Sequence, residues 1–350
     1  MELTKERGTR LRAGLVGCGG FAQAALIPAM RMAPIDLVAV CDRDQERAEA
    51  CGRLLRIPAI YTSLDDLLAR EQLDVVIMAI GPDVYPELAE KAMRAGVDVY
   101  VEKPPAVTVD KALRMREVSR ETGRNLAVGF MKRFATGYRM ARELASAPDF
   151  GRIMHLTARI CSGVWTPVWS SELTPFAFVL DHSVHYLDLI QFYAGPVASV
   201  TAELSQASNE RFGYAVLLRF QSGATGLLEI SNYESRGVPN ERIQLMGSEG
   251  NSVTVENVSR VTYSRNAPPM SLGRHFDPAA DRVVWEPNMT NISPENSSLV
   301  HQGYVGEMRH LADMLLSNRP AKPDIDDGIA AVQLAHAIVA SNGQRIELSR

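Results

Sequence analysis

The chain has 350 residues, of which 46% are hydrophobic and 22% charged, so it is long enough for about two domains and can bury a sizeable core. Lys and Arg number 37 against 41 Asp and Glu, and the net charge of -4 leaves no cationic excess to bind nucleic acid. The longest apolar runs fall short of the ~20 residues that span a bilayer. The first ten residues also lack the apolar stretch of a secretory signal. We therefore expect a soluble cytoplasmic protein that binds neither nucleic acid nor a membrane.

Cysteine and lysine are both sparse. The four cysteines, Cys18, Cys41, Cys51 and Cys161, show no C-x-x-C spacing, which predicts free thiols rather than a disulfide framework or a zinc ribbon. Only six of the 37 basic residues are lysines. A lysine beside a chemical motif is therefore of interest, because arginine cannot supply a titrating amine.

The first 130 residues alternate apolar runs with amphipathic stretches, which predicts five strands and four helices. The strands are expected over residues 11–16, 36–41, 74–80, 98–102 and 125–130. The helices are expected over residues 21–32, 45–55, 84–95 and 109–122. Strands and helices in alternation are typical of a parallel sheet with right-handed crossovers. We expect this sheet to form an N-terminal domain over residues 1–130.

The pattern changes after Phe130. Helices are expected near residues 134–146 and 179–194, and then strands follow one another across short turns, which predicts a mostly antiparallel sheet. These strands are expected over residues 197–206, 214–221, 224–231, 243–246 and 252–256. A segment rich in Pro, Asn and Ser over 264–297 is expected to be a long loop. Helices near 301–317 and 327–341 complete a second domain, residues 131–350.

A glycine-rich hexapeptide, Gly17-Cys18-Gly19-Gly20-Phe21-Ala22, follows the first strand and reads G-x-G-x-x-A. Gly17 would permit a tight turn, Gly19 would let a pyrophosphate approach the backbone, and Ala22 would let helix and strand pack closely. The same peptide also occurs as an ordinary turn of an α/β unit.

Asp42 favours the dinucleotide interpretation. It closes the second strand 20 residues after Ala22, where a carboxylate accepts hydrogen bonds from a ribose diol and repels a 2′-phosphate. NAD should therefore be preferred over NADP, although Arg43 beside it could meet a phosphate.

Glu102-Lys103-Pro104 ends the strand over 98–102 and so emerges at the carboxyl edge of the sheet, where ligands of such folds bind. Pro104 pushes Lys103 out of helical geometry, which could hold its amine towards a cleft. The alternative is a solvated lysine at a strand end.

Asp181, His185 and Asp188 fall at i, i+4 and i+7 of an expected helix and share one face. Histidine suits proton transfer near neutral pH, and a carboxylate one turn away can orient it. Two other interpretations stay open: His185 is an ordinary packed histidine, or His182 and His185 hold a metal with nearby carboxylates. The metal site is disfavoured because His182 lies about 100° around the helix from Asp181.

Together these motifs resemble the hallmarks of the glucose-fructose oxidoreductase/inositol dehydrogenase/rhizopine catabolism (Gfo/Idh/MocA) oxidoreductases. That family combines G-x-G-x-x-G/A, E-K-P and D-x-x-x-H, matched here by residues 17–22, by residues 102–104, and by Asp181 with His185. The resemblance covers nearly the whole chain. It implies an α/β protein with an N-terminal doubly wound Rossmann domain and a C-terminal domain with an open-faced, mostly antiparallel sheet.

Residues 128–134 resemble the crossover between the domains of inositol dehydrogenases, which implies that Lys132 and Arg133 face substrate and cofactor. Two positions depart from the family pattern. The family often has a His where this chain has Tyr85, and a Gly between the Asp and the His where this chain has Ser183. Both departures concern the fit of the substrate rather than the chemistry.

The resemblance implies an NAD-dependent dehydrogenase, without a metal, that interconverts a secondary alcohol and a ketone on a sugar, sugar derivative or cyclitol. It implies that Lys103 hydrogen-bonds the reacting oxygen, that His185 is the general acid/base and that Asp181 orients it. Glu102 and Lys103 would also contact the cofactor, NAD or NADP.

Two alternatives remain. Some relatives are glycosidases or epimerase-like enzymes that recycle a tightly held NAD, and some are sugar-sensing repressors without turnover. The repressor is disfavoured because Lys103 and His185 are both present. Trp165, Trp169, Arg236 and the loop over 264–297 could shape a substrate pocket, or could equally be structural.

The strands between residues 197 and 231 carry apolar residues on both faces, such as Val216 with Leu217 and Leu227 with Leu228. One layer of helices covers only one face of a sheet. We therefore expect the other face to pack against a second subunit, in a homodimer or homotetramer.

Overall fold

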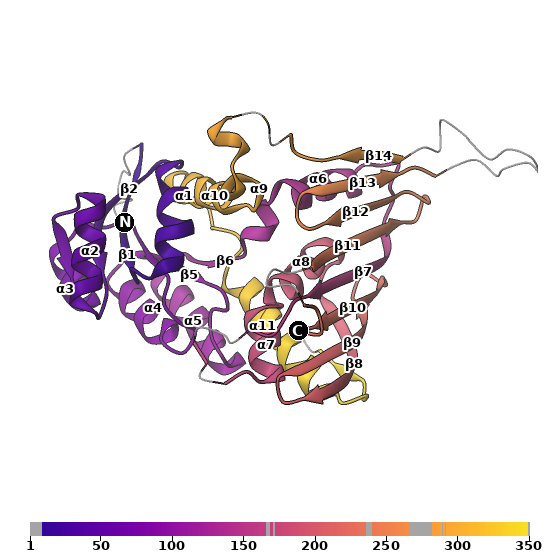
Figure 1. Cartoon of the computed structure of the whole chain (residues 1–350). Helices are drawn as coiled ribbons and strands as arrows, with labels where there is room; N and C mark the ends of the chain where they lie inside the picture. The colour runs from indigo at the N-terminus through magenta and orange to yellow at the C-terminus, as the bar shows by residue number, and fades with distance from the viewer. Residues whose placement is uncertain are drawn as a thin grey trace, which may run out of the picture. The chain divides into compact units, whose positions relative to one another are not determined.

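The computed structural model describes residues 9–165, 169–170, 172–235, 240–266, 282–288, 290 and 292–348 (Figure 1). The chain separates into two compact units. The first ends at Met131 and also contains Tyr304–Val332, and the second contains Lys132–Gly303 and the chain from Gln333 onward. The sequence division at 130/131 placed the whole C-terminal segment in the second domain, whereas this segment contributes to both units.

The first unit is built on a six-stranded sheet in the order β3-β2-β1-β4-β5-β6, with every neighbouring pair parallel. Its strands are β1 (Leu11–Val16), β2 (Ile35–Cys41), β3 (Ala59–Tyr61), β4 (Val75–Met78), β5 (Asp98–Glu102) and β6 (Leu126–Gly129). All residues of β4, β5 and β6 are buried. Parallel strands covered on both faces read as continuous apolar runs, and this pattern made them predictable.

Helices connect these strands. They are a π-helical turn (Ala22–Leu26) that continues into α1 (Ile27–Arg31), α2 (Gln45–Leu55), α3 (Leu64–Arg70), α4 (Tyr85–Arg94) and α5 (Val109–Thr122). Asp44, Ser63 and Thr108 cap the starts of α2, α3 and α5 with their side chains. Gly123 ends α5 with a φ of 66°. The sequence patterns predicted neither β3 nor α3. β3 has only three residues, and none of them is buried.

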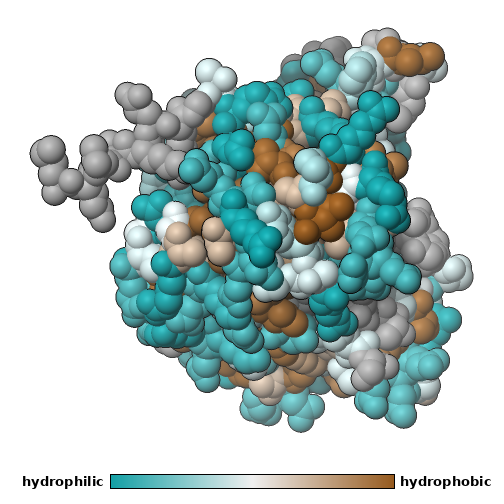
Figure 2. All heavy atoms as spheres, turned by 90° about the vertical axis from the view of Figure 1, so that its left-hand side faces the viewer, coloured by the Kyte–Doolittle hydropathy of each residue, from teal (hydrophilic) through white to brown (hydrophobic). Residues whose placement is uncertain are grey.

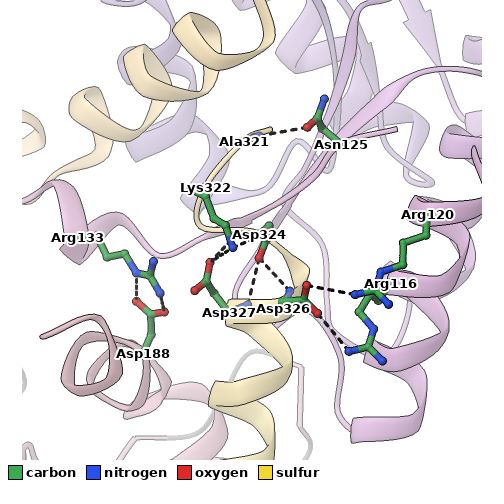
Figure 3. Close-up of polar contacts among 10 residues, drawn as sticks. All are labelled: Arg116, Arg120, Asn125, Arg133, Asp188, Ala321, Lys322, Asp324, Asp326 and Asp327. Atoms are coloured by element: carbon green, nitrogen blue, oxygen red, sulfur yellow. Dashed lines mark hydrogen bonds and ion pairs between the residues drawn. The ribbon is translucent and has the colours of Figure 1, made fainter. Parts of the chain in front are cut away.

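A C-terminal segment completes the first unit. It contains α10 (Tyr304–Leu316) and the start of α11 (Ile325–Ser341). Polar contacts tie it to the strand and helix that precede the crossover (Figure 3): the Ala321 N–H donates to Asn125 Oδ1 at 3.1 Å, and Asp326 pairs with Arg116 at 3.2 Å and with Arg120 at 3.7 Å.

The second unit is built on a nine-stranded sheet in the order β14-β13-β12-β11-β7-β10-β9-β8-β15. Its strands are β7 (Ile153–Cys161), β8 (Val197–Ser208), β9 (Arg211–Phe220), β10 (Thr225–Ser231), β11 (Asn240–Gly247), β12 (Ser252–Glu256), β13 (Arg260–Ser264), β14 (Arg282–Trp285) and β15 (Ile346–Glu347). Among the strands within the described residues of this sheet, β7 and β10 are the one parallel pair. The expected mostly antiparallel sheet is therefore confirmed, but β7, β13, β14 and β15 were not foreseen.

Helices cover one face of this second sheet, and the other face is open. The helical segments of this unit are a 3₁₀ turn (Met131–Phe134), α6 (Thr136–Ala145), α7 (Pro175–Asp181), α8 (Val184–Ala194), α9 (Ser298–His301) and the end of α11 from Gln333. α8 packs on β7, and α6 packs on β12 and β13. On the open face, Leu217 of β9 and Leu227 of β10 lie opposite one another and are each about half exposed.

The expectation of one long loop over residues 264–297 is wrong in part. Residues 282–285 form β14, which pairs with β13 so that Val284 lies opposite Thr262. Ser293 then caps a 3₁₀ turn (Pro294–Asn296). Residues 267–281, like Arg236, lie outside the described residues.

Of the helices in the described ranges, none combines the length and the apolar character needed to cross a membrane. Figure 2 shows that the face seen from the left of Figure 1 is covered mainly by hydrophilic residues, with hydrophobic ones gathered in small groups.

Candidate cofactor and active site

The glycine-rich loop begins where β1 ends, between the ends of β2 and β4. Gly17 has a φ of 97°, a conformation that favours glycine, and its N–H donates to the Cys41 carbonyl at 2.8 Å. A Cβ at Gly17 would lie 2.3 Å from the Ala79 carbonyl oxygen. The loop therefore needs glycine at position 17 for both conformation and space.

The rest of the glycine-rich loop borders open space. A Cβ added at Gly19 or Gly20 would have no atom within 4 Å, Phe21 is largely exposed, and Ala22 is buried at the start of the π-helical turn. The Gln23 N–H donates to the Gly19 carbonyl at 3.1 Å, so the turn continues from the loop without a break. Open space before a glycine pair at the start of a helical segment fits a phosphate group.

Asp42 lies at the end of β2 and is 7% exposed. Its Oδ2 accepts the Cys18 N–H at 2.8 Å, its Oδ1 accepts the Asp44 N–H at 3.0 Å, and the Arg47 guanidinium lies 3.9 Å away. An ionised carboxylate has about four acceptor positions, so these two backbone bonds fix its orientation and leave others for ribose hydroxyls. Arg43 beside it is exposed.

Glu102 and Lys103 follow from β5 at the carboxyl edge of the same sheet. Glu102 is buried; its Oε1 accepts the Tyr100 hydroxyl at 2.9 Å and its Oε2 accepts the Lys103 N–H at 3.2 Å. Burial raises the pKa of Glu102 to about 7, while the charge of Lys103 acts in the opposite direction. Lys103 is half-buried, and the Lys103–Pro104 peptide bond is cis.

Tyr85, the position where the family often has a histidine, is buried at the start of α4. Its hydroxyl oxygen accepts the Ile80 N–H at 3.1 Å, and burial raises the pKa of Tyr85 well above its ordinary value. Tyr85 therefore stays neutral, and its hydroxyl oxygen holds the loop after β4 through the Ile80 N–H.

Asp181 and His185 do not lie on one continuous helix, contrary to the expectation of a helix over 179–194. α7 ends at Asp181 and α8 begins at Val184; in the first turn of α8 the carbonyl of Ser183 accepts the Tyr186 N–H at 2.8 Å. Both Asp181 and His185 are buried. The Asp181 carboxylate accepts the indole N–H of Trp169 at 3.1 Å.

His182, between them, is packed among aromatic rings. Its ring stacks on Phe178 with centroids 4.6 Å apart and meets the edge of Trp165 at 5.5 Å. Within the described residues, no three side chains of His, Cys, Asp or Glu gather closely enough to hold a metal.

Asp188 was expected on the same helix face as His185, but its carboxylate belongs to a different pair. Arg133 binds it at two points, with Nε donating to Oδ2 at 2.8 Å (Figure 3). Both side chains are largely buried, and the guanidinium also lies 5.0 Å from the centre of the Phe192 ring. Arg133, predicted to face substrate, is thus engaged by Asp188.

Lys132, also predicted to face substrate, is buried in an ion pair with Glu241. Its Nζ lies 2.7 and 2.6 Å from the two oxygens of Glu241, and the Tyr138 hydroxyl donates to the same carboxylate at 3.0 Å. The Tyr138 and Tyr186 hydroxyls lie 2.8 Å apart. The charge of Lys132 is therefore neutralised inside the second unit.

Within each unit, the structure brings some predicted residues together. In the first, Asp42 contacts the glycine loop, and Glu102 contacts the backbone of Lys103. In the second, Asp181 and His185 flank one helix break. The meeting of Lys103 with His185 stays a prediction.

Several interaction partners of these residues are not identified by the sequence motifs, for different reasons. Tyr100 lies two positions before Glu102 in a strand, so strand alternation could have placed both on one face. Glu241 and Glu307 are separated from Lys132 and Tyr100 by 109 and 207 positions, and no local pattern signals such pairs.

Two models of one family match the chain. The oxidoreductase family's NAD-binding Rossmann fold matches residues 11–130, and its C-terminal alpha/beta domain matches residues 142–348.

Curated relatives include dehydrogenases acting on several polyhydroxylated compounds. A D-apiose dehydrogenase from Paraburkholderia graminis is 29% identical over 69% of this chain and 66% of the relative, so the match spans just under two thirds of that relative's length. A scyllo-inositol 2-dehydrogenase (NAD(+)) from Bacillus subtilis is 25% identical over 88% of this chain and 86% of the relative. An inositol 2-dehydrogenase from Rhizobium meliloti is 25% identical over 97% and 99%.

Solved structures share the fold. A dehydrogenase from Chromobacterium violaceum has a TM-score of 0.85 at 24% identity, covering 96% of both chains. The WlbA dehydrogenase from Bordetella pertussis, in complex with NADH and UDP-GlcNAcA, has a TM-score of 0.78 at 23% identity, covering 97% of this chain and 98% of that one. With an N-terminal NAD-binding Rossmann domain and a C-terminal α/β domain, this chain belongs to the Gfo/Idh/MocA family of NAD(P)-dependent oxidoreductases.

Proposed function

We propose that the protein is an NAD-dependent dehydrogenase that interconverts a secondary alcohol and a ketone on a sugar, sugar derivative or cyclitol. The observation that carries this proposal furthest is Asp42, a buried carboxylate held beside the glycine loop with acceptor positions left for ribose hydroxyls. Its negative charge in that place opposes a 2′-phosphate, which favours NAD over NADP.

The loop and its neighbours fit the cofactor. Gly19 and Gly20 would receive the pyrophosphate in the open space before them, and Asp42 would accept the hydroxyls of the adenosine ribose. Arg43 and Arg47 are the cations nearest to Asp42 in sequence, and their presence keeps a residual affinity for NADP. When bound, the nicotinamide accepts or returns the hydride.

The remaining chemistry is proton transfer, which this chain's own residues perform. Lys103 donates a hydrogen bond to the reacting oxygen and favours its developing negative charge. His185 takes the hydroxyl proton during oxidation and returns it during reduction. Asp181, itself held by the Trp169 indole, supports the charged form of His185.

The substrate class is supported by the relatives, whose names refer to apiose and to inositols. The direct test is a panel of sugars, sugar acids, nucleotide sugars and cyclitols, each assayed for NAD reduction by absorbance. Reduction with at least one polyhydroxylated compound is expected. Failure of the whole panel, together with stoichiometric NAD that stays bound through gel filtration, would instead favour an enzyme that recycles its cofactor.

The open face of the second sheet supports a homodimer or homotetramer. Leu217 and Leu227 lie opposite one another on this face and remain half exposed in the single chain. Apolar residues paired in this way are typical of a surface that a second subunit covers. Light scattering at micromolar concentration checks this, and a monomer would contradict it.

A further inference from the structure

One tyrosine hydroxyl in the first unit lies between two buried carboxyl groups. The Tyr100 hydroxyl is 2.9 Å from Oε1 of Glu102 and 2.9 Å from Oε2 of Glu307. Tyr100 is 1% exposed, Glu102 6% and Glu307 3%. Glu102 ends β5, whereas Glu307 comes from the first turn of α10, more than 200 positions later.

The number of protons in this arrangement is limited. A tyrosine hydroxyl has one hydrogen, so it can donate to only one of the two carboxyl groups. Burial and both carboxylates raise the pKa of Tyr100 well above its ordinary value, so the hydroxyl keeps its hydrogen. If both glutamates were ionised, one carboxylate oxygen would face a tyrosine lone pair at 2.9 Å in a buried place, which is repulsive. The second contact becomes a hydrogen bond only when that glutamate is protonated and donates to the tyrosine oxygen.

We propose that Tyr100, Glu102 and Glu307 share one carboxyl proton at neutral pH, and that Tyr100 and Glu307 thereby act as positioning residues for Lys103. The two glutamates together then carry one negative charge rather than two. The role in positioning Lys103 rests on the proposed function, whereas the proton sharing stands on the geometry alone.

The surroundings of the three residues favour this state. Burial raises the pKa of Glu102 to about 7, so a proton is retained where an exposed glutamate would lose it. The titratable groups that face Glu102 are Tyr85 from α4, Tyr100 from its own strand and Lys103 after it. Lys103 is the cation among these three, and its charge favours the ionised form of Glu102.

The packing of the neighbouring strand leaves room for the Tyr100 and Glu102 side chains. A Cβ at Gly129 in the neighbouring strand β6 would lie 2.5 Å from the Tyr100 hydroxyl and 2.9 Å from the Glu102 carboxyl carbon. Glycine at this position therefore leaves room for the pair. Glu307 is brought in by α10, which also contacts α1.

Glu102 transmits this state to Lys103 through the backbone. Its Oε2 accepts the Lys103 N–H at 3.2 Å, so the carboxyl group both orients the peptide that carries the lysine and sets the charge beside it. As pH rises and the shared proton is lost, a second negative charge develops next to Lys103.

Infrared spectroscopy of the full chain tests the proton sharing without any substrate. Exposed carboxyl groups are ionised at about pH 7, so a protonated carboxyl band at that pH comes from buried groups. We expect this band in the wild type and a clear weakening of it at pH 7 in Glu307→Gln, because the remaining Glu102 then accepts the Tyr100 hydrogen alone and loses its own proton more readily, while burial still retains part of it. Glu102→Gln should weaken the band as well, and it serves as the second variant if Glu307→Gln fails to fold. Asp313→Asn, on the exposed part of α10, is the matched control and should keep the band. Absence of the band in the wild type, or an undiminished band in a single variant that folds, would overturn the proposal.

A second measurement follows Lys103 itself. The chain has only six lysines, so reductive ¹³C-methylation gives few resonances, and a Lys103→Arg variant assigns that of Lys103. In the wild type this resonance should move through neutral pH as the neighbouring pair ionises, and in Glu307→Gln the midpoint of that movement should shift to lower pH. A movement unchanged in Glu307→Gln would remove the link to Lys103. Both measurements are independent of turnover, so a failure of the proposed dehydrogenase activity is distinguished from a failure of the shared proton.

Discussion

The two units differ in how their functional side chains are held. In the first, the glycine loop and Asp42 lie within 26 positions and are joined by backbone hydrogen bonds, such as that from the Cys18 N–H to Asp42. In the second, charges are joined across long separations, Lys132 to Glu241 and Arg133 to Asp188. The role of a residue within a local motif can therefore be inferred from the sequence, whereas a basic residue next to a motif can be structural.

The largest expected effect concerns the residue at the helix break of the second unit. His185→Ala should lower kcat by about 10²–10⁴-fold and leave NAD binding nearly intact, because the proposed proton acceptor is lost while the glycine loop is unchanged. Steady-state kinetics with a good substrate, alongside NAD titration, measure both. His155→Ala, a half-buried histidine of β7, is the control and should keep near wild-type kcat. Equal kcat values for the two variants would return His185 to a packing role.

The second prediction separates a structural from a substrate-binding lysine. Lys132→Met should destabilise the fold by about 3–5 kcal/mol, because it leaves the Glu241 carboxylate buried without its cation. Urea unfolding measures this, and the double variant Lys132→Met with Glu241→Gln should recover much of the loss. A stable Lys132→Met protein with a raised KM would contradict the structural role and support the substrate contact.

The third prediction concerns the local motif of the first unit. Asp42→Ala should lower kcat/KM for NAD by about 10–100-fold, because a charge-assisted hydrogen bond of about 1.5–3 kcal/mol is lost. It should affect NADP much less, since the repulsion of the 2′-phosphate is lost as well. The ratio of kcat/KM for the two cofactors is the measurement. An unchanged ratio would remove Asp42 from the ribose site.

The contrast between local and long-range contacts also explains which features of each unit could be predicted from the sequence. The buried strands β4 and β6 and the loop from Gly17 were predictable, because continuous apolar runs and a glycine in a turn after a strand are local properties. The break between Asp181 and His185 was not, because α7 ends at Asp181 and α8 starts after Ser183 through small changes in backbone torsion that no residue type demands. The partner of Asp188 was not predictable either, because ion pairing across 55 positions depends on the packing of the whole unit.

The fourth prediction is a pH dependence of stability from Glu102. Its pKa is raised by burial from 4.5 to about 7, so the folded chain holds a proton that the unfolded chain releases between those values. Stability should therefore fall as pH rises through this window, by about 1 kcal/mol per pH unit from this group. Glu102→Gln should flatten that slope in urea unfolding series, whereas Glu87→Gln, an exposed glutamate of α4, should leave it unchanged. A slope unaffected by Glu102→Gln would contradict the raised pKa.

The smallest expected effect tests whether the second unit also contains a local arrangement of the kind seen around Asp42. Trp169 lies 12 positions before Asp181, and its indole N–H is the donor that holds this carboxylate. Trp169→Phe keeps an aromatic ring but removes the donor, so Asp181 loses one hydrogen bond and orients His185 less well. We expect kcat to fall by about 3–10-fold, which corresponds to a net loss of about 1 kcal/mol.

Trp165→Phe is the control, because Trp165 contacts His182 by its ring and its replacement leaves the bond to Asp181 in place. If Trp169→Phe and Trp165→Phe changed kcat equally, the indole N–H would have no special role. If only Trp169→Phe lowered it, with KM unchanged, the second unit would orient its carboxylate by a neighbour in sequence, as the first unit does.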